Sequence, residues 1–403
     1  MKKVVLAFSG GLDTSFCVPY LKEKGYEVYA ATVDTGGFTP KEIKKINDKA
    51  KELDVKKHYF IDGKTSLYNK IATYIIKGNI LRGGVYPLCA GPERIIQAIE
   101  VIKLAKQIDA HTIAHGSTGA GNDQVRFDVA IQTLAPELEI ITPIRELGIT
   151  REKEAVFLKK RGFVVAKAST SYSINKGMLG TTIGGRETKG SWEIPPDDVY
   201  PAVVDIESAP INGQEIIVSF KQGLPVAVDG KAMNGISIMA YLNDLGAKHG
   251  VGKEVHLGNT ILGIKGRIVF EAPAAIIVIK AHKELEKLVL TKWQSYWKDT
   301  ICEAYGNFLH EGLYFDPVTK DIEALIDNSQ KVVTGDVKVK LHKGNIIVVG
   351  VKSPYSLMDK KAATYGEQNL LWTGQEATGF SKIYGLQSIL AAKAKILGDN
   401  YEN

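Results

Sequence analysis

The start of the chain constrains the fold more than any other segment. An apolar run, residues 4–8, leads into the turn Ser9-Gly-Gly-Leu-Asp-Thr-Ser15, and a helical pattern follows as far as Lys24. Two adjacent glycines let the backbone turn sharply and bring its N–H groups close to a bound anion. Thr14 and Ser15 then fall at a helix N-terminus, where free N–H groups and the helix dipole favour phosphate oxygens. This order of strand, glycine turn and helix predicts a phosphate-binding loop in an α/β domain.

The loop lacks the Gly-Lys-Ser/Thr of a P-loop, so it offers no lysine to a γ-phosphate. It suits the pyrophosphate part of ATP, which favours cleavage between the α- and β-phosphates and adenylation over kinase chemistry. A helix cap after a glycine turn is the plainer interpretation, but the position directly after the first strand favours a nucleotide. The loop resembles that of the ATP pyrophosphatase superfamily, the PP-loop adenylating enzymes. This leaves both tRNA-modifying enzymes and small-molecule synthetases open.

The first 165 residues alternate between short apolar runs and longer segments of helical periodicity. Strand-like runs cover 28–33, 58–61, 112–114 and 138–141, and helical patterns cover 40–53, 66–76, 92–108 and 122–134. This alternation predicts an α/β fold, a parallel sheet with helices on both faces. Because such sheets bind ligands beyond the carboxyl ends of their strands, we expect the site in the loops after Phe8, Val33 and Ala114.

The chain beyond residue 165 differs in composition and periodicity from the first part, which predicts a second, α+β domain. Residues 167–203 are rich in Ser, Thr, Gly and Pro, which predicts a long loop that is either functional or disordered. Hairpin-like pairs occur at 215–220 with 225–228 and at 337–341 with 345–351, and helical patterns occur over 236–249 and from 273 past Trp293 and Trp297. A last helical segment carries apolar residues on one face, which would dock either on its own domain or on another subunit. These residues are Ile383, Leu386, Leu390 and Leu397.

Composition limits the partners that we expect. The 403 residues hold 51 Lys and Arg against 45 Asp and Glu, a net charge of +6, and no basic arm for RNA is visible. The three cysteines, Cys17, Cys89 and Cys302, form no Cys-x-x-Cys motif, which favours free thiols in a reducing compartment. No apolar run approaches the length of a membrane span. We therefore expect a cytoplasmic protein with small-molecule partners and with neither nucleic-acid nor membrane partners.

A second glycine-rich motif, Gly116-Ser-Thr-Gly-Ala-Gly-Asn-Asp-Gln-Val-Arg-Phe127, follows the strand-like run 112–114. Asn122 and Arg126 are four residues apart and share one face of the predicted helix. An arginine fork beside a glycine loop is typical of a receptor for a carboxylate or a phosphate. Asp123 could equally cap the helix, and Arg126 could equally form a surface ion pair. At the carboxyl end of a strand, the whole group favours a ligand site.

This second motif resembles the signature of the argininosuccinate synthase family. Three further segments agree with that family: residues 9–15, Lys248-His-Gly-Val-Gly252 and Glu376-Ala-Thr-Gly-Phe380. The resemblance implies condensation of citrulline with aspartate through a citrullyl-adenylate, with ATP cleaved to AMP and pyrophosphate. It also implies a PP-loop nucleotide-binding domain over 1–165, a synthetase domain over 166–370, and a C-terminal helix over 371–403 that assembles a homotetramer.

The resemblance implies roles for individual residues as well. ATP would bind to Ala7, Phe8, Ser9, Gly10, Gly11, Leu12, Asp13, Thr14, Ser15, Val33 and Gly116. Aspartate would bind to Thr118, Asn122 and Asp123, and citrulline to Tyr86, Gly91, Asn122, Arg126, Ser173, Thr182, Gly258 and Phe270. Asp13, Asp123 and Arg126 would act in catalysis by charge and position, because this chemistry needs no covalent nucleophile. Mg²⁺ would accompany ATP, bound mostly by phosphates and water rather than by a metal site of the protein.

The chain departs from the family at the citrulline end of the implied site. Gly91 stands where the family usually has Ser or Thr, Gly258 where it has Glu, and Phe270 where it has Tyr. One interpretation is a site that still binds citrulline through compensating groups. The other is a substrate acylated on its α-nitrogen, such as N-succinyl- or N-acetylcitrulline. The two glycines would then make room for the acyl group, and Arg94 or Arg186 would meet an acyl carboxylate.

Two other classes of function stay open at this point. A tRNA-modifying PP-loop enzyme would need a basic RNA-binding face and, for thiolation, paired reactive cysteines, and the sequence shows neither. A non-enzymatic nucleotide-binding module would bind ATP without releasing pyrophosphate. The complete second motif favours the ligase over both alternatives.

Overall fold

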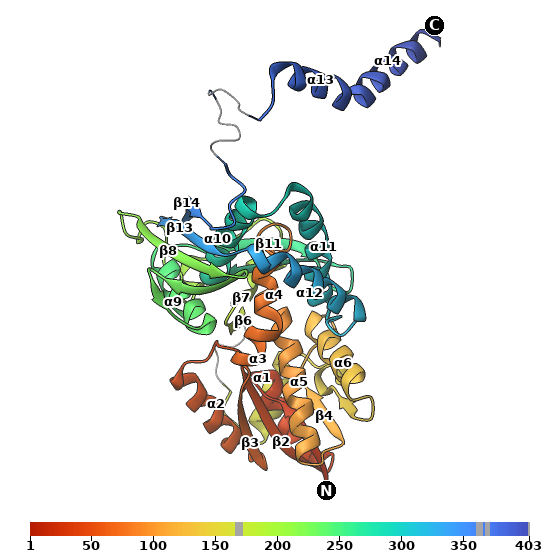
Figure 1. Cartoon of the computed structure of the whole chain (residues 1–403). Coiled ribbons are helices and arrows are strands. Elements are labelled where there is room, and N and C mark those ends of the chain that lie inside the picture. Colours follow the sequence, from red (N-terminus) through yellow and green to blue (C-terminus); the bar gives the residue numbers. More distant parts are fainter. Residues whose placement is uncertain (166–171, 360–365, 367–370, 402–403) are drawn as a thin grey trace. The chain divides into compact units, whose positions relative to one another are not determined.

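The computed structural model describes residues 1–165, 172–359, 366 and 371–401 (Figure 1). The chain forms two compact units, Met1–Tyr355 and Ser356–Asn403. Within the described ranges, no helix is both long enough and apolar enough to cross a membrane. Residues 167–171 of the predicted loop and residues 402 and 403 of the predicted C-terminal helix lie outside the described residues. The domain boundaries at 165 and 370 stay predictions.

The N-terminal part of the first unit is a five-stranded parallel sheet in the order β3-β2-β1-β4-β5. Its strands are β1 (Lys2–Ala7), β2 (Tyr26–Asp34), β3 (Lys57–Asp62), β4 (Thr112–His115) and β5 (Glu139–Ile141). Val4 and Leu6 pack on one face, which is covered by α1 (Leu12–Glu23), α2 (Pro40–Glu52), α7 (Pro143–Leu147) and α8 (Arg151–Lys160). Val5 packs on the other face, against α5 (Gly91–Gln107) and α6 (Asn122–Leu134). The alternation along β1 thus places helices on both faces, and the predicted α/β fold is confirmed.

The rest of the first unit is an α+β part with two sheets, β10-β9-β8-β13-β14 and β11-β12-β7-β6. The strands are β6 (Tyr172–Gly177), β7 (Gly180–Gly185), β8 (Gln214–Lys221), β9 (Leu224–Val228), β10 (Lys231–Ala232), β11 (Lys253–Asn259), β12 (Lys265–Glu271), β13 (Gly335–His342) and β14 (Asn345–Lys352). The helices are α3 (Lys64–Leu67), α4 (Thr73–Lys77), α9 (Gly235–Lys248), α10 (Pro273–Val289), α11 (Lys292–Glu311) and α12 (Pro317–Ser329). A π-helical turn, η1 (Tyr68–Ala72), joins α3 to α4, and short 3₁₀ turns are η3 (Arg186–Lys189), η4 (Asp197–Val199) and η5 (Gln330–Val332). The predicted hairpins are confirmed as β8–β9 and β13–β14.

Two predictions about this part were wrong. The segment predicted as a long loop contains the antiparallel hairpin β6–β7, and β7 also pairs with β12. The segment has many glycines and few apolar residues, so its sequence shows no strand pattern. The strands form because β7 pairs with β12, which is far along the chain. The helix predicted to continue past Trp297 instead ends at Val289, and the Thr291 side chain caps α11 in a capping box with Gln294. A local cap therefore overrides the helical periodicity there.

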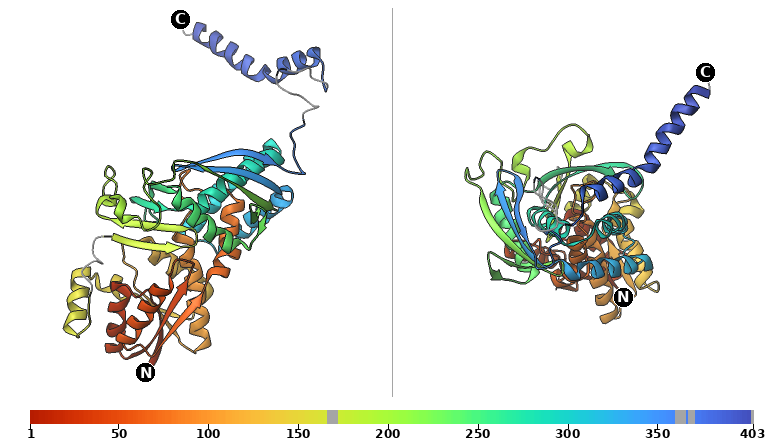
Figure 2. Two further views of the ribbon diagram at one scale, coloured as in Figure 1. Left: turned by 90° about the vertical axis from the view of Figure 1, so that its left-hand side faces the viewer. Right: turned by 45° about the horizontal axis from the view of Figure 1, so that its top comes forward.

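The hairpin β6–β7 lies between the parallel sheet and the bulk of the α+β part, while the N-terminus lies at the opposite end of the sheet (Figures 1 and 2). β1 pairs in parallel with β2 and β4, so their carboxyl ends share one edge. The backbone N–H of Met178, at the tip of the hairpin, donates to the carbonyl of Thr35 just after β2 at 2.9 Å. This arrangement closes a site over the ends of the parallel strands.

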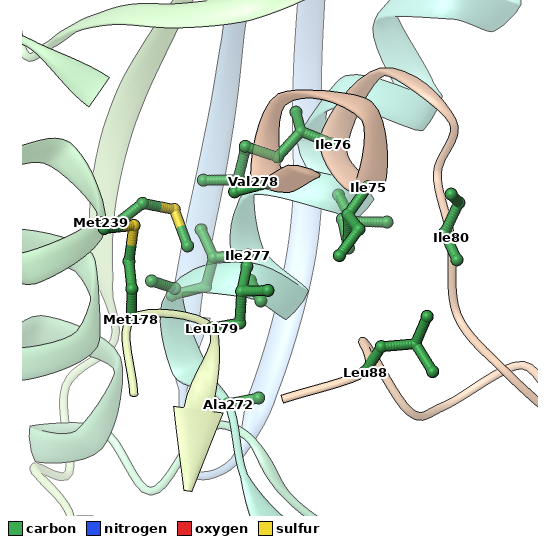
Figure 3. Close-up of a cluster of buried hydrophobic side chains, with 14 of the residues drawn as sticks. Ile75, Ile76, Ile80, Leu88, Met178, Leu179, Met239, Ala272, Ile277 and Val278 are labelled. Atoms are coloured by element: carbon green, nitrogen blue, oxygen red, sulfur yellow. The ribbon is translucent and has the colours of Figure 1, made fainter. Parts of the chain in front are cut away.

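The largest buried cluster belongs to the α+β part and joins it to the helix that follows β3. Ile75 and Ile76 of α4 are fully buried together with Ile277 and Val278 of α10. Figure 3 shows these side chains beside Met178 and Leu179, which lie in the tip of the hairpin. The same core therefore supports one wall of the site.

The second unit consists of α13 (Gly374–Tyr384) and α14 (Leu386–Tyr401), two helices where the sequence predicts one apolar-faced helix. Gly385 separates them, and glycine is a poor helix former. Leu386, Leu390 and Leu397 are exposed by half or more of their surface. Whether another subunit covers this apolar face stays a prediction.

We predict that Ile277→Ala destabilises the first unit by about 2–5 kcal/mol, because it removes buried methyl and methylene groups and leaves a cavity. The measurement is the midpoint of urea unfolding, which should fall. The matched control is Ile347→Ala on β14, where the side chain is 48% exposed, and its midpoint should stay close to that of the wild type. Equal midpoints for the two variants would contradict the described core.

Candidate active site

One cleft of about 780 Å³ lies over the carboxyl ends of β1, β2 and β4. Most of the residues implied by the family resemblance line it: Ala7, Phe8, Ser9, Gly11, Leu12, Asp13, Thr14, Val33, Tyr86, Gly91, Gly116, Thr118, Asn122, Asp123, Arg126, Ser173, Thr182 and Gly258. Three implied residues, Gly10, Ser15 and Phe270, are not among its lining residues. The individual roles of all these residues stay predictions.

The loop after β1 has the geometry of an anion site. Gly10 has φ +72°, in the left-handed region that favours glycine, so it is the residue that makes the turn possible. The Ser9 hydroxyl accepts from the N–H of Gly11 at 3.3 Å and contacts the Thr14 hydroxyl at 3.2 Å. No side chain caps α1. The N–H groups of its first turn are therefore left for a ligand.

Asp13 is the charged acid of this loop. It lies 3.7 Å from Arg151 and next to Glu154 of α8. Burial raises the pKa of the Glu154 carboxyl, and the nearby Asp13 charge raises that pKa further. The neutral form of the Glu154 carboxyl is therefore favoured beside Asp13.

The second glycine loop touches the first. A Cβ added to Gly116 would lie 3.3 Å from the backbone of both Asp13 and Thr14, tighter than most such contacts. His115, which is buried just before it, accepts from the N–H of Ser117 on Nδ1 at 3.3 Å and contacts Asp128 through Nε2 at 2.9 Å. Both nitrogens of this histidine are engaged, which makes it a structural support of the loop.

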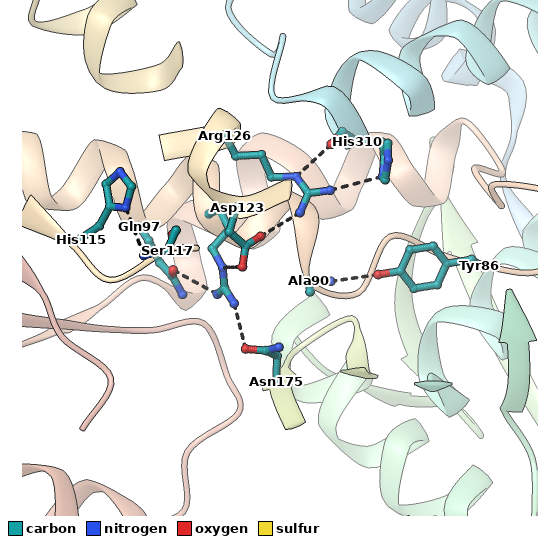
Figure 4. A network of polar contacts seen from close by, with 10 residues as sticks. Tyr86, Ala90, Gln97, His115, Ser117, Asp123, Arg126, Asn175 and His310 are labelled. Atoms are coloured by element: carbon teal, nitrogen blue, oxygen red, sulfur yellow. Dashed lines mark hydrogen bonds and ion pairs between the residues drawn. The ribbon is translucent and has the colours of Figure 1, made fainter. Parts of the chain in front are cut away.

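Asp123 joins two arginines that line the cleft, Arg94 and Arg126 (Figure 4). Its carboxylate accepts from Arg94 Nε at 2.9 Å and from Arg126 at 2.8 Å. Burial alone would raise the pKa of Asp123, but the two guanidiniums outweigh it and lower the pKa to about 2. A third of the side chain is exposed, so the carboxylate is both ionised and open to the cleft.

Arg94 spans three elements, which the sequence did not reveal. Besides Asp123, it donates to Gln97 at 3.1 Å and to Asn175 of β6 at 2.9 Å. Each of its three nitrogens donates to one of these partners, and the suggested contact of Arg94 with an acyl carboxylate stays a prediction. Arg186, the other suggested residue, lies over the ring of Tyr172 and is not among the residues that line the cleft.

Arg126 is buried and held by His310 at the end of α11. Its Nε donates to the His310 carbonyl at 2.8 Å, and its guanidinium contacts His310 Nδ1 at 3.3 Å. Burial, followed by the charges of Arg126 and Arg82, lowers the pKa of His310 to about 3. His310 is therefore a neutral acceptor that fixes the arginine fork.

Both glycines at the citrulline end line the cleft, and an added Cβ at either one would meet a neighbouring side chain. A Cβ on Gly91 would lie 3.1 Å from the guanidinium of Arg126, so this glycine makes room for the arginine. A Cβ on Gly258 would lie 2.5 Å from His256 Nε2 and 3.4 Å from Arg82. His256 and Arg82, which sequence reasoning missed, therefore line this corner of the cleft.

Aromatic rings form the wall beside this corner. The ring of Tyr86 stacks on His256 with centroids 5.5 Å apart and packs on Phe270 at 5.1 Å. Phe270 is fully buried and pairs with Thr182 across β12 and β7. Its place is thus behind the wall rather than in the cleft.

A glycine-rich loop at the end of the first strand, facing a polar cleft at the edge of a parallel sheet, defines a nucleotide-binding α/β domain. Family models for "Arginosuccinate synthase N-terminal HUP domain" and "Arginosuccinate synthase C-terminal domain" match residues 3–164 and 172–391. The chain belongs to the argininosuccinate synthase family.

Individual relatives match over nearly their whole length. The argininosuccinate synthase of Staphylococcus epidermidis is 38% identical over 402 residues, which covers 100% of this chain and 99% of the relative. That of Pyrococcus furiosus is 40% identical over 390 residues, which covers 96% and 94%. A solved structure, a predicted subunit of a tRNA methyltransferase from Methanocaldococcus jannaschii, shares 19% identity with a TM-score of 0.29 over 40% of this chain and 76% of that chain. A likeness that weak carries no argument. The full-length relatives, which are argininosuccinate synthases, favour the ligase over the tRNA-modifying alternative.

We predict that Asp123→Asn destabilises the protein in a pH-dependent way. Because folding lowers the pKa of Asp123 from 3.8 to about 2, the carboxylate stabilises the fold above about pH 4, and this contribution is lost as the pH falls toward 2. The difference in thermal midpoint between wild type and variant should therefore be largest near pH 6 and shrink by pH 3. The control is Asp48→Asn, an exposed site on α2, which should show no such trend.

Proposed function

We propose that this protein is an ATP-dependent ligase that joins the amine of aspartate to the ureido carbon of citrulline, giving argininosuccinate, AMP and pyrophosphate. The relatives that match its full length are argininosuccinate synthases. The observation that carries the proposal is the contact of the two glycine loops at Gly116, which brings the nucleotide loop beside Asp123 and Arg126 in one cleft. A reaction that needs three substrates side by side requires this juxtaposition.

In the first step, the loop Ser9–Ser15 and the first turn of α1 hold the phosphates of ATP. The ureido oxygen of citrulline attacks the α-phosphorus in line, an O–P bond forms, and the bond to the β-phosphate breaks to release pyrophosphate. Positioning and neutralisation of charge drive such a transfer. Arg126, fixed by His310, orients the ureido substrate.

In the second step, the amine of aspartate attacks the ureido carbon, and AMP leaves. Asp123 attracts the α-ammonium of aspartate, and Thr118 and Asn122 complete this subsite. Asn122 is held in place because its Oδ1 accepts from the N–H of Ile261 at 2.9 Å. Asp123 with Arg94 and Arg126 carries a net positive charge, which suits an amino acid with two carboxylates.

Mg²⁺ accompanies ATP in this proposal. Asp13 is the carboxylate of the phosphate loop, and a cation that prefers oxygen ligands and is bound mainly through phosphates needs only one or two carboxylates. The described residues contain no cluster of three acids, histidines or cysteines that could form a separate metal site. When bound, the ion would neutralise charge on the phosphates.

We also propose that the protein acts in the cytoplasm as a homotetramer. Cys17, Cys89 and Cys302 are all buried free thiols, which suits a reducing compartment. The exposed apolar side chains of α13 and α14 suit assembly with other copies of the chain.

The test is a reconstitution with the purified full-length chain, ATP, Mg²⁺, aspartate and citrulline. We expect pyrophosphate and AMP in equal amounts and a product with the mass of argininosuccinate. Omitting aspartate should abolish that product. Hydrolysis of ATP to ADP, or pyrophosphate release that ignores citrulline, would contradict the proposal.

We further predict that Gly116→Ala lowers kcat/KM for ATP by roughly tenfold. The added methyl displaces the backbone of Asp13 and Thr14 by a few tenths of an ångström, and misplacement on that scale weakens in-line transfer. Gly119→Ala in the same loop is the matched control, since its Cβ would contact only Arg145, at 3.6 Å. Steady-state kinetics with varied ATP separates the two variants, and equal effects would contradict the loop contact.

A further inference from the structure

Arg82 is fixed at the corner of the cleft by a tight turn. Its backbone N–H donates to the carbonyl of Tyr86 at 2.8 Å, and the N–H of Tyr86 donates back at 3.1 Å. Gly83 and Gly84 between them have φ of +61° and +78°, the left-handed region that favours glycine. The turn therefore places an arginine directly beside the tyrosine proposed to contact citrulline.

The guanidinium of Arg82 forms no ion pair within the part of the chain that the structure describes. It donates to the carbonyl of Asn259 at 2.9 Å and contacts His256 Nε2 at 3.4 Å. The side chain is half-buried and lines the cleft. Burial lowers the pKa of Arg82. Glu311, an exposed acid at the end of α11, raises that pKa and Arg126 lowers it, each from beyond ion-pair distance. A guanidinium that lines a cleft without a carboxylate beside it can pair with a carboxylate of a ligand.

Every acid that lines this cleft is engaged elsewhere. Asp123 holds Arg94 and Arg126, and Asp13 lies beside Arg151 in the phosphate loop. Glu93 is 2% exposed, and burial raises the pKa of its carboxyl well above the usual range. None of the three faces the corner at Arg82 as a free carboxylate.

The surroundings of Gly258 therefore repel an ammonium group. Its Cα lies against His256 and Arg82, where the family resemblance implies a glutamate. The α-ammonium of a free amino acid in this corner would meet the positive charge of Arg82. Burial, and then the charge of Arg82, lower the pKa of His256, so its imidazole is neutral and adds no opposite charge to offset that repulsion. An acylated α-nitrogen is a neutral amide and avoids that repulsion.

We propose that Arg82, with His256 beside it, forms a carboxylate subsite, and that the ureido substrate of this cleft carries a dicarboxylic acyl group, such as succinyl, on its α-nitrogen. The inference rests on the proposed ligase function and changes one part of it, because the ureido substrate is then a citrulline acylated on its α-nitrogen rather than free citrulline. The acyl carboxylate supplies the anion that Arg82 lacks. The ureido group at the other end of the molecule is unchanged, so the bonds that form and break are the same.

The first experiment compares three ureido acids by pyrophosphate release from the full-length chain with ATP and aspartate. These are citrulline, N-acetylcitrulline, which lacks the ammonium and adds no carboxylate, and N-succinylcitrulline. We expect the highest kcat/KM for N-succinylcitrulline, roughly tenfold or more above N-acetylcitrulline, as charge-assisted hydrogen bonds typically give. A kcat/KM for N-acetylcitrulline or citrulline at or above that for N-succinylcitrulline would overturn the subsite.

The second experiment removes the charge with Arg82→Gln. We expect KM for N-succinylcitrulline to rise roughly tenfold while N-acetylcitrulline changes little, because only the former loses an ion pair that is kept throughout the reaction. Arg82→Lys, which keeps the charge, should recover part of the preference. If Arg82 has a purely structural role, Arg82→Gln should lower kcat/KM for both substrates by the same factor, and this result would overturn the proposal. Arg161→Gln, which breaks an exposed pair with Glu23, is the matched control and should leave both unchanged.

The outcomes separate this inference from the proposed function. Turnover of citrulline without any preference for the succinylated substrate would leave the ligase function standing and overturn the subsite. Turnover of N-succinylcitrulline without turnover of citrulline would overturn citrulline as the substrate and support the subsite. If none of the three ureido acids gives pyrophosphate, both the proposed ligase function and the carboxylate subsite are overturned.

Discussion

The carboxylate of Asp123 is the contact on which the rest of the site depends. It is at the start of α6, and through Arg94 it reaches α5 and Asn175 of β6. Through Arg126 it reaches His310 at the end of α11. Four elements that are far apart in the sequence are thus held around one ionised group. A carboxylate whose pKa is as low as about 2 keeps this charge throughout the physiological range.

The parallel sheet could be predicted because its signals are local. Short β-branched runs and helical periodicity alternate over the first 165 residues, and each is set by neighbours within one turn or one strand. The hairpin β6–β7 could not be predicted in this way, since its glycine-rich strands depend on pairing with β12. In that pairing Thr182 lies opposite Phe270, which is far away in the sequence. The break before α11 was missed for the opposite reason: a single cap at Thr291 outweighs the periodicity on both sides.

The residues of the candidate site can likewise be divided into those with a local sequence pattern and those without one. The loop at Gly10 and the motif at Gly116 could be found because glycine turns that hold anions have a sequence pattern, and the structure places both loops in contact. Arg82 and His310 belong to no pattern and reach the cleft only through the tertiary fold. The neighbour of Gly91 could not be predicted, because a missing side chain says nothing about which residue lies beside it, and here that residue is Arg126.

Charge is distributed unevenly between the chain and its cleft. The whole chain has a modest excess of +6, yet six Lys and Arg residues and only three Asp and Glu residues line the cleft within the described ranges. One of those three acids, Glu93, is driven toward its neutral form by burial. Phosphates and carboxylates are the groups that such a cleft attracts, and each acid that remains charged is bound to an arginine rather than left to repel them. Among the Lys and Arg residues that line the cleft, Arg82 and Arg267 form no ion pair with a carboxylate of the described residues, and Arg82 is the one in the turn that ends at Tyr86, where a carboxylate of a ligand can pair with it.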